Sequence, residues 1–86
     1  MYYVYILFSL KDKKFYVGYT TNLKLRYQQH QNGEVRSTFY RRPVKLIYYE
    51  AYSDEANAKR RELFYKSGRG RETLHKILRE TLAKFI

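Results

Sequence analysis

The chain opens with nine consecutive uncharged residues that are rich in aromatic and β-branched side chains, Tyr2–Leu10. A polar stretch, Lys11–Lys14, separates them from a second apolar run, Phe15–Tyr19. Such runs favour strands, and two of them joined by a few polar residues favour an antiparallel hairpin. The first run is too short to cross a bilayer and lacks the basic start of a signal peptide. The sequence therefore predicts a β-hairpin.

Alternation along the two predicted strands sorts their side chains onto opposite faces. Tyr3, Tyr5 and Leu7 share one face of the first strand, and Tyr16 and Gly18 share one face of the second. Tyr5 and Tyr16 can therefore lie on the same face of the hairpin. Aromatic residues on strands are ordinarily packing groups, so this placement alone predicts no chemistry.

The rest of the pattern predicts a third strand with helices before and after it. A helix capped by Thr21 or Asn22 should end near Gln31, a basic loop should follow over Glu34–Arg42, and a strand should run over Val44–Tyr49. The next expected elements are a helix capped by Ser53 or Asp54 and ending at Lys66-Ser67-Gly68, a loop over Lys66–Arg71, and a last helix with the apolar stripe Leu74, Ile77, Leu78, Leu82 and Phe85. The order ββαβαα indicates an α+β fold, a small three-stranded antiparallel sheet flanked by helices. We expect one domain over residues 1–86, because a chain of this length builds one core.

The net positive charge of the chain indicates which class of molecule it binds. Eighteen Lys and Arg against eight Asp and Glu give a formal net charge of +10, which concentrates polyanions near the surface. Nucleic acid is the expected partner. The alternatives are a generically basic, soluble protein, a protein that binds ribosomal RNA or an anionic membrane, and an adaptor that docks on an acidic protein or the ribosome. The lack of Cys excludes a disulfide framework and thiolate zinc sites, and we expect a cytoplasmic protein. No Ser-His-Asp order, metalloprotease helix motif or phosphate-binding Gly loop is present.

The first predicted helix carries charge on its apolar stripe. Leu23, Arg26, Tyr27 and His30 fall at the i, i+3, i+4 and i+7 positions of one helix face. Burying an unpaired ionised group costs several kcal/mol, so such residues usually face a partner or a polar cleft. The alternative is that Arg26 extends outward to solvent while His30 packs at the edge of the stripe.

Glu62 is the second candidate, because acidic residues are scarce and this one lies among Lys59, Arg60, Arg61 and Lys66. A metal ion could bind beside it. The alternative is an ion pair between Glu62 and Lys66, which are spaced i, i+4 in the favourable order, worth about 0.3 to 0.5 kcal/mol. Spacing alone favours the ion pair.

These residues taken together resemble a known family. The triplets Tyr3-Val4-Tyr5 and Tyr16-Val17-Gly18, followed by Arg26 and His30 on a helix and by Glu62 on a later one, resemble the GIY-YIG endonuclease superfamily, and in particular its small stand-alone single-domain branch. The resemblance covers about residues 2–68. It implies an endonuclease that hydrolyses phosphodiester bonds in DNA or another nucleic acid, with one Mg²⁺ or Mn²⁺ held by Glu62.

The same resemblance assigns roles to the other residues. Tyr5 would orient or deprotonate the attacking water, and His30 would tune it. Arg26 would stabilise the charge that grows on the phosphate, and Tyr16 would position water or phosphate. A free Tyr has a pKa near 10, so Tyr5 needs help to act as a base at neutral pH.

Basic groups outside this set are expected to hold the nucleic-acid backbone. They are Arg36, Arg41, Arg42, Lys66, Arg69 and Arg71. Phe39 and Tyr40 lie among them and could stack on a base in a single-stranded or distorted substrate, or could pack over the edge of the sheet.

The chain departs from the family pattern in three ways. Tyr3 replaces the Gly of the first triplet, and Val replaces Ile at positions 4 and 17. The downstream Asn of the family has no counterpart among Lys66, Ser67 and the basic residues that follow. These departures leave two alternatives to the nuclease: a catalytically weak or inactive nucleic-acid-binding module of the same fold, and a basic adaptor.

Overall fold

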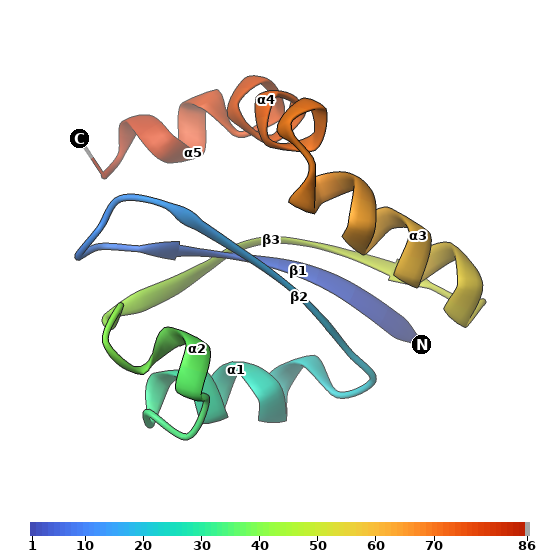
Figure 1. Ribbon diagram of the computed structural model, residues 1–86, viewed down its shortest axis with the longest axis horizontal. Coiled ribbons are helices and arrows are strands. Elements are labelled where there is room, and N and C mark those ends of the chain that lie inside the picture. The colour runs from blue at the N-terminus through green and yellow to red at the C-terminus, as the bar shows by residue number, and fades with distance from the viewer. Residues whose placement is uncertain (86) are drawn as a thin grey trace.

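The computed structural model describes residues 1–85, which form a three-stranded antiparallel sheet with helices on both faces (Figure 1). The strands are β1 (Tyr2–Ser9), β2 (Phe15–Thr20) and β3 (Val44–Tyr52), and their order in the sheet is β2-β1-β3. The apolar first run is therefore the central strand, paired on both sides. This architecture confirms the predicted α+β fold.

The hairpin turn is built from polar side chains in place of an Asn-Gly pair. The hydroxyl of Ser9 accepts hydrogen bonds from the backbone N–H groups of Lys11 and Asp12, and Asp12 accepts one from the N–H of Lys14. Lys13 takes the left-handed conformation, with φ of 61°. Because Ser9 turns the chain, β1 ends one residue earlier than the expected Leu10.

On one face of the sheet lie α1 (Leu23–Gln31) and α2 (Arg36–Phe39) (Figure 1). The side chain of Asn22 caps α1 by accepting from the N–H of Leu25 at 3.1 Å, and Gly33, with φ of 79°, follows the end of the helix. The first helix is thus confirmed. The expected loop over residues 34–42 was wrong in part, since buried Val35 and Thr38 hold one helical turn there.

On the opposite face lie α3 (Glu55–Lys66), α4 (Gly68–Ile77) and α5 (Arg79–Ala83). The expected loop over residues 66–71 was wrong, because Ser67 both ends α3 and caps α4 through a hydrogen bond from the N–H of Gly70. A side chain at Gly70 would overlap the carbonyl of Phe64. This glycine therefore permits a close approach of two helix backbones. The expected last helix is two helices, divided at Leu78.

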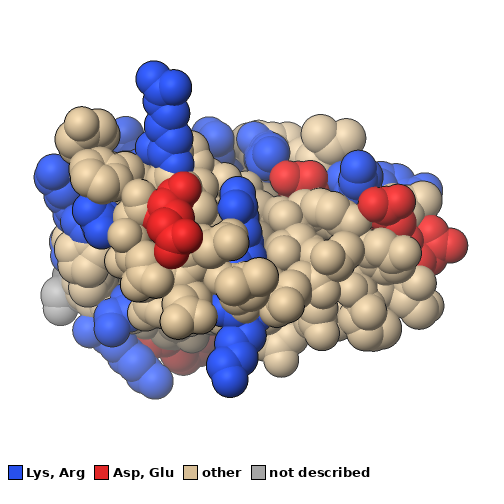
Figure 2. Space-filling model, turned by 90° about the horizontal axis from the view of Figure 1, so that it is seen from below, with Lys and Arg blue, Asp and Glu red and all other residues tan. Residues whose placement is uncertain are grey.

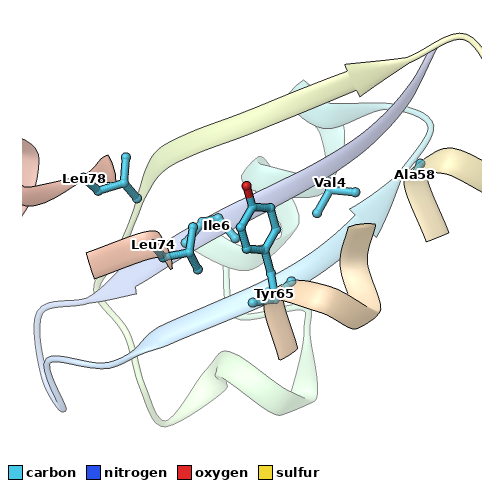
Figure 3. Packing of buried hydrophobic residues seen from close by; sticks show 7 residues of the cluster. Val4, Ile6, Ala58, Tyr65, Leu74 and Leu78 are labelled. Atoms are coloured by element: carbon cyan, nitrogen blue, oxygen red, sulfur yellow. The ribbon is translucent and has the colours of Figure 1, made fainter. Parts of the chain in front are cut away.

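The main core lies between the sheet and α3 and α4 (Figure 3). Its buried members are Val4, Ile6, Val17, Ala58, Tyr65, Leu74 and Leu78. A smaller cluster on the other face contains Tyr5, Leu7 and Val44. The two faces divide the residues of β1 as strand alternation predicts. No helix within residues 1–85 is long and apolar enough to cross a membrane.

A polar network joins β3 to α3 on the side of the sheet that carries the main core. The carboxylate of Glu50 accepts hydrogen bonds from the hydroxyls of Tyr48 and Tyr52, both at 2.6 Å, from Nε of Arg61 at 2.9 Å and from the hydroxyl of Tyr65. Arg61 also donates to the Tyr65 hydroxyl at 2.8 Å. Because Arg61 directly precedes Glu62, this network also sets the position of the Glu62 backbone.

Candidate active site

Tyr5 and Tyr16 come together at the β2 side of the sheet because of a glycine. Tyr5 on β1 pairs with Gly18 on β2, and the ring of Tyr5 lies so close to Gly18 that a side chain there would overlap it. The ring centres of Tyr5 and Tyr16 are 6.4 Å apart. The absence of a side chain at Gly18, the glycine of the second triplet, therefore leaves the space that the Tyr5 ring fills.

A buried chain of hydrogen bonds runs from Tyr5 into the α1–α2 layer. The Tyr5 hydroxyl lies 2.7 Å from Nε2 of His30, and Nδ1 of His30 lies 2.8 Å from Oγ1 of Thr38. The Thr38 hydroxyl donates to the carbonyl of Val35, so it accepts from Nδ1–H of His30. Nε2 of His30 then carries a lone pair and accepts a hydrogen bond from the Tyr5 hydroxyl. Tyr5 is 1% exposed, and His30 and Thr38 are 0% exposed.

Burial keeps both members of the Tyr5–His30 pair neutral at pH 7. It raises the pKa of Tyr5 to about 12, although the nearby guanidinium of Arg26 opposes the shift. Burial, together with the positive charge of Arg26, lowers the pKa of His30 to about 4. The resting state is therefore a phenol that donates to a neutral imidazole.

Arg26 and Tyr16 are half-buried groups beside this pair. Arg26 donates from Nη1 to Oε1 of Gln29 at 3.2 Å, and its charge acts on both Tyr5 and His30. The ring centre of Tyr16 is 5.2 Å from that of His30, and its hydroxyl accepts a hydrogen bond from Ser37 at 3.3 Å. Arg26 thus faces the polar groups of the site.

Glu62 lies on α3, the helix on the other face of the sheet. Its negative charge makes a small contribution to the raised pKa of Tyr5 and of Tyr19. It also pairs with Nζ of Lys66 at 2.9 Å, so the ion pair expected from the spacing is present. The Glu62 side chain is 21% exposed, which leaves it accessible.

The available donors suit a hydrated divalent cation held by few protein ligands. Among residues 1–85, no group of three or more His, Cys, Asp or Glu side chains could enclose an ion. A single carboxylate such as Glu62 fits Mg²⁺, which keeps several waters and often binds through one or two carboxylates and substrate phosphates. The residues present fit a hydrated magnesium ion of that kind.

The basic residues predicted to hold nucleic acid divide into two groups. Arg41 is bound internally, to Asp12 at 2.6 Å and to the carbonyl of Phe15 at 3.1 Å, while Lys66 pairs with Glu62. Arg42 donates to the carbonyl of Phe39 at 3.0 Å. Arg36, Arg69 and Arg71 are exposed, on α2 and α4. In Figure 2, the face that α1 and α2 cover has basic side chains toward one end and along its edges, an acidic side chain among them, and further acidic side chains at the opposite end.

Sequence reasoning missed the contribution of α2. Thr38 fixes the orientation of the His30 ring, and Ser37 holds the Tyr16 hydroxyl. A Ser-Thr pair inside a polar stretch has no periodicity that marks it, because a single helical turn is shorter than the pattern that reveals a helix. Only the position of His30 above these residues identifies them.

Comparisons with known proteins identify the family of this chain. Residues 1–75 match the family described as the GIY-YIG catalytic domain. UPF0213 protein CPE1444 of Clostridium perfringens is 43% identical over 67 residues, which cover 77% of this chain and 71% of that protein. UPF0213 protein SH2523 of Staphylococcus haemolyticus is 44% identical over 66 residues, covering 76% and 79% of the two chains.

A solved structure is similar as well. The solution NMR structure of the UPF0213 protein BH0048 from Bacillus halodurans matches with a TM-score of 0.56 and 36% identity. The match covers 90% of this chain and 85% of that one.

Proposed function

The chain belongs to the GIY-YIG family, and on that premise we propose that it is a divalent-metal-dependent endonuclease that hydrolyses phosphodiester bonds in nucleic acid, with DNA favoured over RNA. A fold hosts many functions, so the proposal depends on the site. The observation that carries it is the buried Tyr5–His30 hydrogen bond beside Arg26 and Tyr16, with the charge of Glu62 acting on Tyr5.

Arg26 and Tyr16 are the groups that a phosphate meets first, because they are half-buried while Tyr5 and His30 lie beneath them. The Arg26 guanidinium can donate two hydrogen bonds to phosphate oxygens and offset the charge that grows on them during attack. The hydroxyl of Tyr16 can hold a phosphate oxygen or the attacking water. Ser37 orients that hydroxyl.

Tyr5 and His30 supply a path for the proton of the attacking water. Since the Tyr5 proton points at Nε2 of His30, the phenol oxygen keeps lone pairs free to accept from water. As the water attacks, its proton passes to Tyr5 and the proton of Tyr5 passes to His30. The imidazolium that forms keeps its Nδ1–H bond to Thr38. Arg26 disfavours this second charge, and the growing negative charge of the phosphate compensates it.

Glu62 is the residue that would hold Mg²⁺ or Mn²⁺. When bound, the ion would polarise a phosphate oxygen and lower the pKa of a coordinated water. Lys66 competes for the carboxylate of Glu62, so its ammonium group must move aside when the ion binds. Because Lys66 is exposed, this movement requires no rearrangement of the core.

A nucleic-acid-binding module without efficient cleavage is the second candidate. Two observations favour it: Tyr5 and His30 are almost wholly buried, and Glu62 already has a cationic partner. In that case the Tyr5–His30–Thr38 chain serves only to join α1 and α2 to the sheet.

Cleavage of a labelled panel of single-stranded, duplex and branched DNA and RNA, with Mg²⁺ or Mn²⁺, separates the two candidates. We expect the wild type to cut and Glu62→Ala to bind without cutting. Glu72→Ala, an exposed acid on α4, is the matched control and should cut normally. Activity that is equal in all three preparations would indicate a contaminating nuclease. Binding without cutting by the wild type across the panel would favour the binding module.

A further inference from the structure

The short helix α2 has two chemically different sides. Ser37 and Thr38 contact the site, through the Tyr16 hydroxyl at 3.3 Å and His30 at 2.8 Å. The two residues that follow them, Phe39 and Tyr40, turn outward and are 40% and 79% exposed. Tyr40 is the most exposed large hydrophobic residue within residues 1–85. The alternative that these rings pack over the sheet edge is therefore wrong for Tyr40.

The outward rings are held in place from behind. Their centres are 4.8 Å apart and their planes meet at 77°. The guanidinium of Arg42 lies 4.3 Å from the centre of the Phe39 ring, and its Nε donates to the carbonyl of Phe39 at 3.0 Å. Gly33 allows this packing, because a side chain there would contact the Arg42 guanidinium. Phe39 is thus a fixed support, and Tyr40 is the ring that remains open to a partner.

The surroundings select the chemistry of that partner. Arg42 lies against the Phe39 ring, and Arg36 precedes the two rings by three and four positions in the chain. Arg41 also follows them, but its guanidinium is paired with Asp12. An exposed aromatic surface among cations suits a polyanion with flat, apolar faces, and a nucleic acid has both. Inside an intact duplex the faces of the bases are covered by their neighbours, so away from the duplex ends this ring can stack only on an unpaired base.

We propose that Phe39 and Tyr40 form a stacking platform for an unpaired nucleobase next to the phosphate at Tyr16 and Arg26, and that the chain prefers single-stranded or splayed nucleic acid to intact duplex. The inference rests on the proposed function, which places the phosphate at that site. Tyr40 follows Ser37 by about one helical turn, roughly 5 Å along the axis. A base adjacent to the bound phosphate can reach the ring at that separation.

Binding measured without divalent metal tests the platform separately from cleavage. The probes are an oligonucleotide carrying 2-aminopurine, as a single strand and within its duplex, mixed with wild type, Tyr40→Ala and Tyr40→Phe. Tyr49→Ala is the matched control, because Tyr49 is 52% exposed and lies on β3 in an open groove of about 700 Å³ with Tyr3 and Tyr27.

We expect Tyr40→Ala to weaken single-strand binding between roughly five- and one-hundredfold and to reduce quenching of 2-aminopurine, with little change for the duplex. Tyr40→Phe keeps the ring and should behave as wild type. Equal losses for single strand and duplex in Tyr40→Ala, or losses confined to Tyr49→Ala, would overturn the platform.

The outcomes also separate this inference from the nuclease proposal. A wild type that binds single strands through Tyr40 but never cuts them would remove the nuclease and leave the platform standing. A wild type that binds no nucleic acid would remove both.

Discussion

The hydrogen bond between Tyr5 and His30 is the residue-scale feature on which the proposed chemistry depends. A phenol that donates to an imidazole can take a proton from water only by passing on its own, so the two groups act as one unit. Tyr5 is 1% exposed and His30 is 0% exposed, so if one of the two groups is removed by mutation, bulk water cannot replace its hydrogen bond to the other. Function and local stability are therefore coupled at this position.

Tyr5→Phe should remove the proton path and leave the ring in place over Gly18. We expect cleavage to fall by about a hundredfold or more, because positioned acid–base groups contribute roughly 10² to 10⁴ in rate. The free energy of unfolding should fall by about 1 to 3 kcal/mol, since Nε2 of His30 loses its partner. Single-turnover cleavage and denaturant unfolding measure the two effects, and an unchanged cleavage rate would remove Tyr5 from the mechanism.

Gly18→Ala should act through the same ring. The added methyl group would overlap the Tyr5 ring, and overpacking of this kind costs about 1 to 3 kcal/mol. The matched control is Gly68→Ala, where no atom lies within 4 Å of the new methyl group. Thermal unfolding should show a lower Tm for Gly18→Ala and no loss for Gly68→Ala. Equal stability of the two variants would contradict the packing described here.

At the scale of elements, the position of α3 depends on Glu50 of β3. Burial tends to raise the pKa of Glu50, but the ion pair with Arg61 and hydrogen bonds from Tyr48, Tyr52 and Tyr65 hold it at about 2. The carboxylate thus receives donors from its own strand and from α3. Since Glu62 follows Arg61, loss of this network should shift the candidate metal ligand as well.

The pH dependence of stability follows from the lowered pKa of Glu50. The ordinary value is 4.5 and the folded value is about 2, so the stabilisation is complete above pH 4.5 and is lost as the pH falls towards 2. We expect Glu50→Gln to be less stable than wild type at pH 7 and to show a smaller loss between pH 4.5 and 2. Glu80→Gln, an exposed acid on α5, should keep the wild-type profile. Identical profiles for wild type and Glu50→Gln would exclude this role.

At the scale of the whole molecule, a net charge of +10 is distributed unevenly between structural and free cations. Arg41 ties the hairpin turn to the segment after α2 through Asp12 and the carbonyl of Phe15. Arg71 is exposed on α4 and has no acidic partner among residues 1–85, although it lines the same open groove of about 540 Å³ as the Asp12–Arg41 pair, with Lys13, Lys14 and His75. The same residue type therefore has two different uses.

Salt dependence of DNA binding distinguishes these uses. We expect Arg71→Ala to make the slope of log K for DNA binding against log salt concentration shallower by the amount of about one phosphate contact. The Tm should not change. Arg41→Ala should lower the Tm, because the turn loses its ion pair and a backbone hydrogen bond. A slope that does not change in Arg71→Ala would place that residue outside the interface.

Much of the fold could be predicted because local sequence patterns indicate the strands and the long helices. The run of aromatic and β-branched residues in Tyr2–Ser9 and the Asn22 cap depend on neighbours a few residues apart, so the sequence alone reveals them. The departures lie where the signal is tertiary. Gly70 resembles a loop residue in sequence, but it is a point of contact between α3 and α4.

The sequence by itself determined the central hairpin, the face shared by Tyr5 and Tyr16, and the basic charge, because these follow from strand period and composition. Only the tertiary structure decided that His30 accepts from Tyr5, that Thr38 holds His30, and that Tyr40 is free while Arg41 is engaged. The physical reason is that each of these states depends on contacts between residues from different elements, whose directions and burial exist only once the chain has packed.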